Sequence, residues 1–151
     1  MMANFYLRLL HFGHLLRRPM TLGVRGAAFD GDGRIFLVRH TYLAGWHLPG
    51  GGVEAGEPAL AALTRELAEE GRLEALSAPE LVAVYYNDSG SRRDHVILYR
   101  CTVRQTEPVR PNREIAEAGF FALDALPETL SPASRRRIEE LCFDAPLSDR
   151  W

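Results

Sequence analysis

One amphipathic helix limits most strongly what this chain can fold into. Residues 58–70 carry Leu60, Leu63 and Leu67 at positions i, i+3 and i+7, which form one apolar stripe. Pro58 suits the first helical position because its missing N–H group would have no partner there. The apolar side of such a helix has to be covered by another element. The rest of the chain must therefore supply a sheet or a second helix to pack against it.

The segments around this helix predict strands and one further helix. Two strands are expected at residues 21–29 and 34–39, joined by a hairpin turn in which Asp-Gly pairs tolerate positive φ. Further strands are expected at residues 81–86, 95–103 and 120–123. Ser131 and Pro132 then open a last helix that runs to about residue 142. This order predicts an α/β fold in which a mixed sheet lies between helices.

Residues 4–18 predict an additional N-terminal helix that ends before Pro19. We therefore divide the chain into an amphipathic helix at residues 1–19 and a domain at residues 20–151. A basic amphipathic helix can lie on a membrane. Packing on its own domain or on a partner subunit is the more common use of an apolar stripe. We expect the second arrangement, with a homodimer as one possibility and no membrane anchoring.

Composition excludes several classes of protein. The 151 residues suit one domain, and the net charge of -2 with a pI near 6.2 argues against a nucleic-acid binder. All 18 basic residues are arginine, so Schiff-base and P-loop lysine chemistry are absent. No stretch approaches the ~20 apolar residues of a membrane span. The two cysteines permit one disulfide at most. We expect a cytoplasmic protein.

Three glutamates crowd the middle helix. Glu66, Glu69 and Glu70 stand at i, i+3 and i+4, and we expect them to project from the side opposite the leucines. Taken alone, a solvated acidic face is the usual explanation of such a cluster. A triple glycine after Pro49 changes the interpretation, because backbone carbonyls can approach a ligand closely there. Carboxylate and carbonyl oxygens are the ligands that Mg²⁺ prefers.

From Gly51 the sequence reads glycine, five residues, Glu57, seven residues, and then Arg65-Glu66-Leu67-Ala68-Glu69-Glu70. This pattern resembles the Nudix box, the signature of the Nudix hydrolases, over residues 51–73. Eight of its nine specified positions match, and Arg72 stands where the box has its closing glycine. Because glycine adopts the left-handed conformation more easily than arginine, we expect the helix to end one residue early, on Gly71.

The resemblance implies a Nudix-like α/β/α sandwich with a central mixed sheet, preceded by the extra N-terminal helix. It implies hydrolysis of a pyrophosphate bond in a nucleoside di- or triphosphate derivative by water attack on phosphorus, with Mg²⁺ or Mn²⁺ as the cofactor. The metal ligands carried over from the box are the Gly51 carbonyl and the carboxylates of Glu66, Glu69 and Glu70. Arg65 joins these glutamates in the catalytic group by fixing one of them through an ion pair. Family members often add an acid from outside the box, for which Glu114 is the first candidate and Glu117 the second.

The substrate contacts are predicted from residue types around the glycine turn. Arg39 can pair with a phosphate, and the ring of Trp46 can stack on a base. Trp46 is equally expected to have only a structural role, packed in the hydrophobic core or at its rim. Tyr85 and Tyr86 alternate on a strand, so only one of them can face the cleft. We select Tyr85 as that residue.

Two other functions compete with a small-nucleotide hydrolase. The first is a catalytically silent Nudix-like module that binds a nucleotide or a protein. Three mutually repelling glutamates speak against it, because a silent domain has no need to hold them together. The second keeps the hydrolase and makes RNA 5′ ends its substrate. The net charge of -2 and the absence of lysine disfavour RNA.

Overall fold

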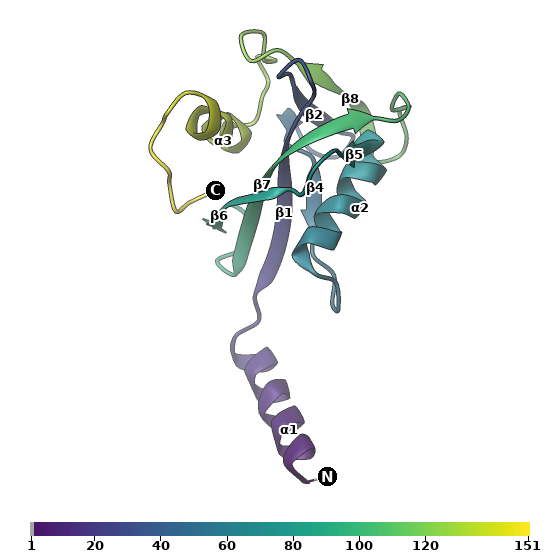
Figure 1. The fold of residues 1–151 in the computed structure, drawn as a ribbon. Coiled ribbons are helices and arrows are strands. Elements are labelled where there is room, and N and C mark those ends of the chain that lie inside the picture. Colours follow the sequence, from purple (N-terminus) through teal and green to yellow (C-terminus); the bar gives the residue numbers. More distant parts are fainter. Residues whose placement is uncertain (1) are drawn as a thin grey trace.

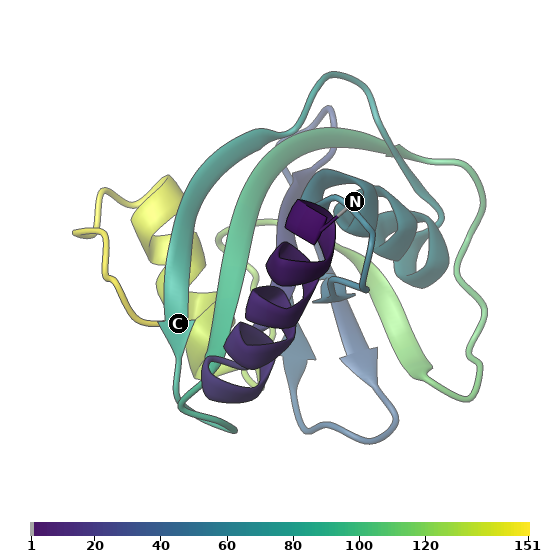
Figure 2. The same cartoon turned by 90° about the horizontal axis from the view of Figure 1, so that it is seen from below.

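Strand β1 lies at the centre of a mixed sheet that carries a helix on each face (Figures 1 and 2). The structure is a computed structural model that describes the backbone of residues 2–151 and the side chains of residues 10–151. The strands are β1 (Thr21–Phe29), β2 (Ile35–His40), β3 (Trp46–His47), β4 (Gly50–Gly52), β5 (Leu73–Ala75), β6 (Glu80–Asn87), β7 (Asp94–Gln105) and β8 (Ile115–Phe121). The helices are α1 (Met2–Arg17), α2 (Ala59–Gly71) and α3 (Pro132–Cys142).

The sheet combines one parallel pairing with several antiparallel ones. Strand β1 pairs in parallel with β7, from Thr21 opposite Asp94 to Phe29 opposite Thr102. It pairs antiparallel with β2 and with β4, whose three residues are all glycine. Strands β3 and β8 extend the sheet from β2, and β5 and β6 extend it from β7. The predicted mixed sheet is confirmed.

Each face of the sheet has its own hydrophobic core, because side chains alternate along the strands. In Figure 2, α2 and α3 lie on opposite sides of the strands. The core under α2 contains Val24, Phe36 and Val38 from the strands together with Ala62, Leu63 and Leu67 from the helix. The core under α3 contains Ile35, Leu37, Tyr85 and Leu98 together with Ile138. Neighbouring residues of β2 therefore point toward different helices.

Most predicted elements are present with small changes at their ends, but the strand expected at residues 120–123 is β8, which begins five residues earlier, at Ile115, and ends at Phe121. The hairpin turn between β1 and β2 is confirmed, since Gly33 has φ 76° and its N–H group donates to the carbonyl of Asp30 at 3.1 Å. Ser131 caps α3 by accepting a hydrogen bond from the N–H group of Ser134 at 3.2 Å. Pro58 precedes α2 as its N-cap, one place earlier than predicted. Strands β3, β4 and β5 were not predicted, because two or three residues carry too little periodicity.

The end of α2 corrects a prediction. Arg72 adopts the left-handed conformation at φ 54° and ψ 39°, and its N–H group donates to the carbonyl of Ala68 at 3.1 Å. Gly71 stays helical and is buried. A Cβ atom on Gly71 would lie 2.7 Å from Cγ of Leu73 and 2.8 Å from Cε1 of Phe36. The expected early stop on Gly71 is therefore wrong: steric space requires that glycine, and Arg72 carries the positive φ.

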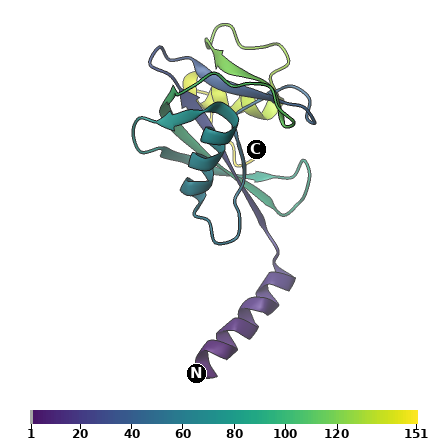
Figure 3. The ribbon, with the colours of Figure 1, turned by 90° about the vertical axis from the view of Figure 1, so that its right-hand side faces the viewer.

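Helix α1 extends away from the sheet and the other two helices (Figures 1 and 3). Leu10, Phe12, Leu15 and Leu16 on this helix are exposed, so the expected docking on its own domain is not observed. Side chains of residues 4–9, which belong to the predicted apolar stripe, lie outside the described residues. In the described part of the chain, no helix has the length and apolar character needed to cross a membrane. A homodimer through α1 stays a prediction.

We expect substitutions at the two residues that end α2 to have opposite effects on stability. Arg72→Gly should raise the free energy of unfolding by about 1 kcal/mol, because glycine adopts the left-handed conformation without a Cβ clash. Gly71→Ala should lower it by roughly 1–3 kcal/mol, because the added methyl group overpacks the space beside Leu73 and Phe36. Chemical denaturation of both variants measures these changes. A stabilised Gly71→Ala variant or a destabilised Arg72→Gly variant would contradict this description of the helix end.

Candidate active site

Glu70 is the most buried of the three predicted acids. It follows Leu63 by seven residues, which is only about 20° around an α-helix, so it points toward the sheet rather than away from it. Its side chain is 12% exposed, and that of Glu66 is 14% exposed. Glu69 faces solvent at 61% exposure. The expectation that all three acids project opposite the leucines is wrong for Glu66 and Glu70, which lie beside the buried Leu63 and Leu67. Leu60, the third residue of the predicted stripe, is exposed.

Both carboxylate oxygens of Glu70 have partners from the sheet. Its Oε1 atom lies 2.9 Å from Nε2 of His40, the last residue of β2. Its Oε2 atom accepts a hydrogen bond from the N–H group of Gly50 at 2.8 Å. The ring of His40 is buried and stacks on Tyr42 with a centroid distance of 5.2 Å. Glu70 is thus held between the end of β2 and the start of the glycine turn.

Arg65 binds the acids on the outer side of α2. Its Nε atom lies 2.9 Å from a carboxylate oxygen of Glu57, and its Nη1 atom lies 2.6 Å from Glu66. The same Nη1 atom is 3.5 Å from Glu69, and Nη2 donates to the carbonyl of Gly52 at 3.1 Å. The ion pair with Glu57 lowers the pKa of that carboxyl group. The predicted ion pairing of Arg65 with a glutamate is therefore present.

The glycine turn brings the backbone against Glu66. A Cβ atom on Gly51 would lie 2.5 Å from Oε1 of Glu66, so any larger residue there would displace that carboxylate. Arg25, from β1, secures the same turn by donating from Nη1 to the carbonyls of Leu48 at 2.9 Å and Gly50 at 3.0 Å. The backbone of the glycine turn and the carboxylates of α2 therefore meet at one place between β4 and α2.

Burial and charge make the ionised form of Glu70 unfavourable. The pKa of Glu70 is raised to about 7, mainly by burial and also by the nearby charges of Glu66 and Glu114. The Gly50 hydrogen bond and the charge of Arg25 act in the opposite direction. The pKa of His40 is lowered, first by burial and then by the charges of Arg25 and His47. A buried carboxyl group in this environment gains from a nearby cation.

The donor set suits a hard divalent cation, which prefers carboxylate and carbonyl oxygens. Glu66 and Glu70 come from α2, Gly50 and Gly51 contribute backbone, and Glu114 approaches from the segment before β8. The carbonyl of Glu114 accepts the N–H group of Thr41 at 2.9 Å, which fixes that segment beside the end of β2. Among the described residues, no three acidic, His or Cys side chains already converge on one point. Arg65 and His40 instead hold the carboxylates separately.

Two predicted substrate contacts lie together but apart from these carboxylates. Arg39 and Trp46 face each other across β2 and β3 on the side of the sheet covered by α3. Nη2 of Arg39 binds Glu117 at 2.9 Å, which places this second candidate acid away from Glu70. The ring of Trp46 packs on Phe121 with a centroid distance of 4.9 Å. Of the two candidate outside acids, Glu114 is the one near Glu70.

The structure does not place Tyr85 in the candidate site. Its side chain is fully buried under α3, where its hydroxyl group donates to Glu140 at 3.0 Å. The guanidinium of Arg137 lies 4.0 Å from the centroid of its ring. Strand alternation showed that Tyr85 and Tyr86 face opposite sides, but it did not show which side each one faces. We therefore withdraw Tyr85 as a substrate contact.

Sequence reasoning did not find two residues of this site. Neither His40 nor Arg25 was predicted from the sequence to belong to this site. The helical wheel contains the missing signal, since it places Glu70 above Leu63 on the side that faces the sheet. A carboxylate on that side requires polar partners from the strands. His40 and Arg25, on the adjacent strands β2 and β1, are such residues.

One family model and several solved structures match this chain over most of its length. A family model described as the NUDIX domain matches residues 19–141. A MutT NUDIX hydrolase from Burkholderia pseudomallei is 28% identical with a TM-score of 0.64, over 80% of this chain and 97% of that one. An ADP-ribose pyrophosphatase from Streptococcus suis is 29% identical with a TM-score of 0.64, over 87% of this chain and 95% of that one.

A shorter part of the chain is similar in sequence to another protein. It is 43% identical over 58 residues to an RNA pyrophosphohydrolase from Gluconobacter oxydans, covering 34% of each chain. This match therefore spans only about a third of that relative. It bears on a segment of the domain, while the two structures bear on the whole fold.

The raised pKa of Glu70 predicts how stability depends on pH. A carboxyl group whose folded pKa lies above its unfolded value favours folding below the unfolded value. Its contribution is lost as pH rises from about 4.5 through about 7, and it amounts to roughly 3 kcal/mol. The metal-free protein should therefore lose stability over this range relative to Glu70→Gln. Denaturation of both proteins at several pH values measures the difference, and parallel curves would contradict the assignment.

The contact between His40 and Glu70 predicts a distinction between two similar substitutions. In His40→Gln, the side-chain amide replaces Nε2 and can still reach Glu70, whereas the shorter amide of His40→Asn replaces Nδ1. His40→Gln should keep the metal affinity of the wild-type protein. In His40→Asn the metal affinity should fall about tenfold, as expected when a residue that orients a metal ligand is lost. Titration with Mn²⁺ followed by electron paramagnetic resonance measures both. His95→Gln is the control, because the ring of His95 lies beside Tyr86 on the pair of strands β6 and β7, away from Glu70. Equal affinities for the Gln and Asn variants would contradict the role of His40.

Proposed function

Because the chain belongs to the Nudix family, we propose that it hydrolyses a pyrophosphate bond in a nucleoside di- or triphosphate derivative with a divalent cation. The observation that carries this proposal is the buried carboxyl group of Glu70 beside Glu66, Glu114 and the glycine turn. Holding these acids together costs free energy, and a bound Mg²⁺ or Mn²⁺ removes that cost. The similar hydrolases of Burkholderia pseudomallei and Streptococcus suis support the same reaction class.

The residues of the candidate site have separate parts in this proposal. Glu66, Glu69, Glu70 and Glu114 supply carboxylates, and the Gly51 carbonyl completes the oxygen ligands. The cation supplies charge neutralisation on the phosphates and lowers the pKa of the attacking water. Arg65 keeps Glu66 and Glu69 oriented through the ion pairs described above. His40 and the Gly50 N–H group fix the direction of the Glu70 carboxylate.

This arrangement can perform the reaction without a protein nucleophile. Phosphoryl and nucleotidyl transfer depend mainly on positioning and charge neutralisation. Arg39 and Trp46 lie on the other face of the sheet, so a substrate that reached them would have to pass the sheet edge formed by β3. We retain them as proposed contacts for the part of the substrate that is remote from the reacting phosphate.

RNA is a second candidate substrate, favoured by the match to an RNA pyrophosphohydrolase. The net charge of -2 still speaks for a small nucleotide. A substrate panel decides between them when it includes nucleoside triphosphates, nucleotide sugars, ADP-ribose and an RNA oligomer with a 5′-triphosphate. Hydrolysis of the small nucleotides with Mg²⁺ is expected. Release of pyrophosphate from the RNA but not from the small nucleotides would show that RNA is the substrate. Absence of hydrolysis of every compound would favour the catalytically silent binding module.

Glu70→Gln tests the role of the central acid. It removes the charge with almost no change in shape, so the fold should persist while kcat/KM falls by about 100-fold or more, as expected for a lost metal ligand. Glu74→Gln is a matched control, because Glu74 on β5 pairs with Arg104 outside the site. Steady-state kinetics with Mg²⁺ measure both variants. Turnover of Glu70→Gln at the wild-type rate would refute the assignment.

The expected homodimer remains a separate proposal. The exposed apolar residues of α1 favour association, and the basic residues of that helix limit it. Sedimentation velocity of the full chain over a dilution series measures the oligomeric state. A single monomeric species at all concentrations would contradict the homodimer.

A further inference from the structure

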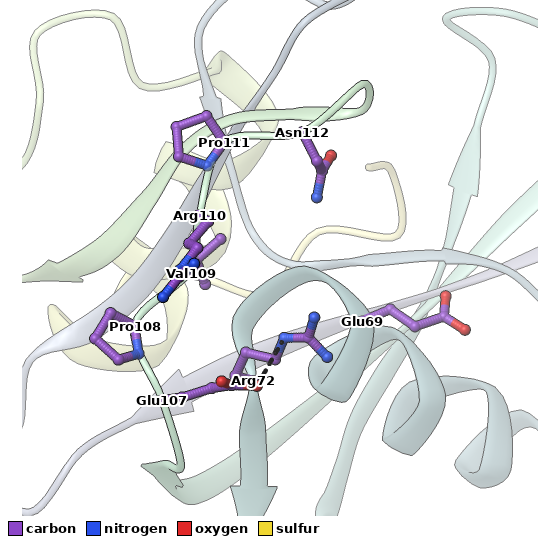
Figure 4. A pocket seen from close by; sticks show the side chains of 8 residues that line it. All are labelled: Glu69, Arg72, Glu107, Pro108, Val109, Arg110, Pro111 and Asn112. Carbon is purple, nitrogen blue, oxygen red and sulfur yellow. Dashed lines mark ion pairs between the residues drawn. The ribbon is translucent and has the colours of Figure 1, made fainter.

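A pocket of about 200 Å³ lies at the C-terminal end of α2, outside the carboxylate site (Figure 4). We call it the helix-end pocket. Glu69 and Arg72 line it from the end of the helix, and the loop of residues 107–112 lines it from the other side. Glu69 also contributes to the proposed metal site, where its carboxylate contacts Arg65. The helix-end pocket and the reaction site therefore share one wall.

Arg72 occupies a backbone conformation that the fold could obtain more easily from glycine. The hydrogen bonds of Arg72 to Ala68 and Thr106 use its backbone atoms, so they need no side chain. Its Nε atom lies 3.4 Å from a carboxylate oxygen of Glu107, in an ion pair whose two side chains are more than half exposed. Such an exposed pair stabilises a protein little. The left-handed backbone of Arg72 is strained, and its side chain adds little stability. This combination points to a functional use of the guanidinium group.

Arg110 is presented to the same pocket by a restrained loop. Pro108 and Pro111 flank it and fix two backbone φ angles. Val109 packs against the core under α2, which anchors the loop from inside. Among the described side chains, no carboxylate lies within ion-pair distance of Arg110, and the Nη atoms of Arg72 have no hydrogen-bond partner. Two guanidinium groups with free donors therefore line one pocket.

We propose that Arg72 and Arg110 form a subsite for a phosphate group of the substrate, an inference that rests on the proposed function. Guanidinium groups match the geometry of phosphate oxygens and bind them through charge-assisted hydrogen bonds. Because Glu69 borders both the helix-end pocket and the proposed reaction site, a phosphate chain bound at the carboxylates can extend past Glu69 to both arginines. The subsite favours substrates that carry a phosphate beyond the bond that is cleaved.

Binding of inorganic tripolyphosphate to the metal-free protein tests the subsite, because the unneutralised carboxylates repel this anion. Isothermal titration calorimetry at low ionic strength gives the Kd. Arg110→Gln and Arg72→Gly should each raise Kd about tenfold, the loss expected for one charge-assisted hydrogen bond. Arg104→Gln should leave Kd unchanged, because Arg104 pairs with Glu74 away from the helix-end pocket. Since Arg72→Gly is expected to stabilise the fold, unfolding cannot explain its loss of binding.

A second readout uses the metal-loaded protein and the best substrate of the panel. Both variants should raise KM several-fold and leave kcat unchanged, because the subsite is remote from the reacting atoms. Tripolyphosphate binding that is lost in these variants, in a protein that hydrolyses nothing, would support the subsite and refute the proposed function. Hydrolysis by a protein whose tripolyphosphate affinity is unchanged in both variants would refute the subsite alone. Absence of binding to the wild-type protein, or equal loss in Arg104→Gln, would also overturn it.

Discussion

A carboxyl group buried on the inner side of α2 is the constraint on which the rest of the site depends. Glu70 occupies the position above Leu63 that a purely structural helix would give to an apolar residue. The polar environment around it follows from this placement. His40 at the end of β2, the Gly50 N–H group, and Arg25 behind the turn each compensate part of the cost of burying it. A divalent cation completes this compensation, which explains how one helix can serve both packing and chemistry.

The two faces of the sheet have different tasks. The face under α2 carries the carboxylates, the glycine turn and the arginine that orders them. The face under α3 holds a structural network in which the buried Arg137 joins Glu140 at 2.7 Å and lies over Tyr85. Arg137 also donates from Nη1 to the carbonyl of Arg150 at 2.7 Å, which fixes the C-terminal segment beside α3. Acidic groups that repel one another can thus be grouped on one face while the other face stabilises the sheet.

Local sequence patterns predicted the longer helices and strands, and with them most of the fold. The strands of two or three residues were too short to show a pattern. The leucines of α2, the Asp-Gly turn and the Ser-Pro start of α3 each specify their conformation through nearby residues. The resemblance to the box also predicted that Arg65 forms an ion pair with a glutamate. Tertiary contacts decided the remainder. The space that requires glycine at position 71 is set by Phe36 and Leu73, and Tyr85 faces the side of the sheet on which Arg137 lies over its ring. The partnership of His40 with Glu70 joins residues 30 positions apart, which no local pattern contains.

The ionisation of Glu70 tests the central claim most directly. Nuclear magnetic resonance of the protein with ¹³C-labelled glutamate follows the side-chain carboxyl carbon of Glu70 through a pH titration, and Glu70→Gln identifies its signal. We predict a pKa near 7 in the metal-free protein, because burial opposes the charge. Saturating Mg²⁺ should bring the pKa well below its ordinary value of 4.5, because the cation stabilises the carboxylate. A pKa near 4.5 that Mg²⁺ does not change would contradict the account.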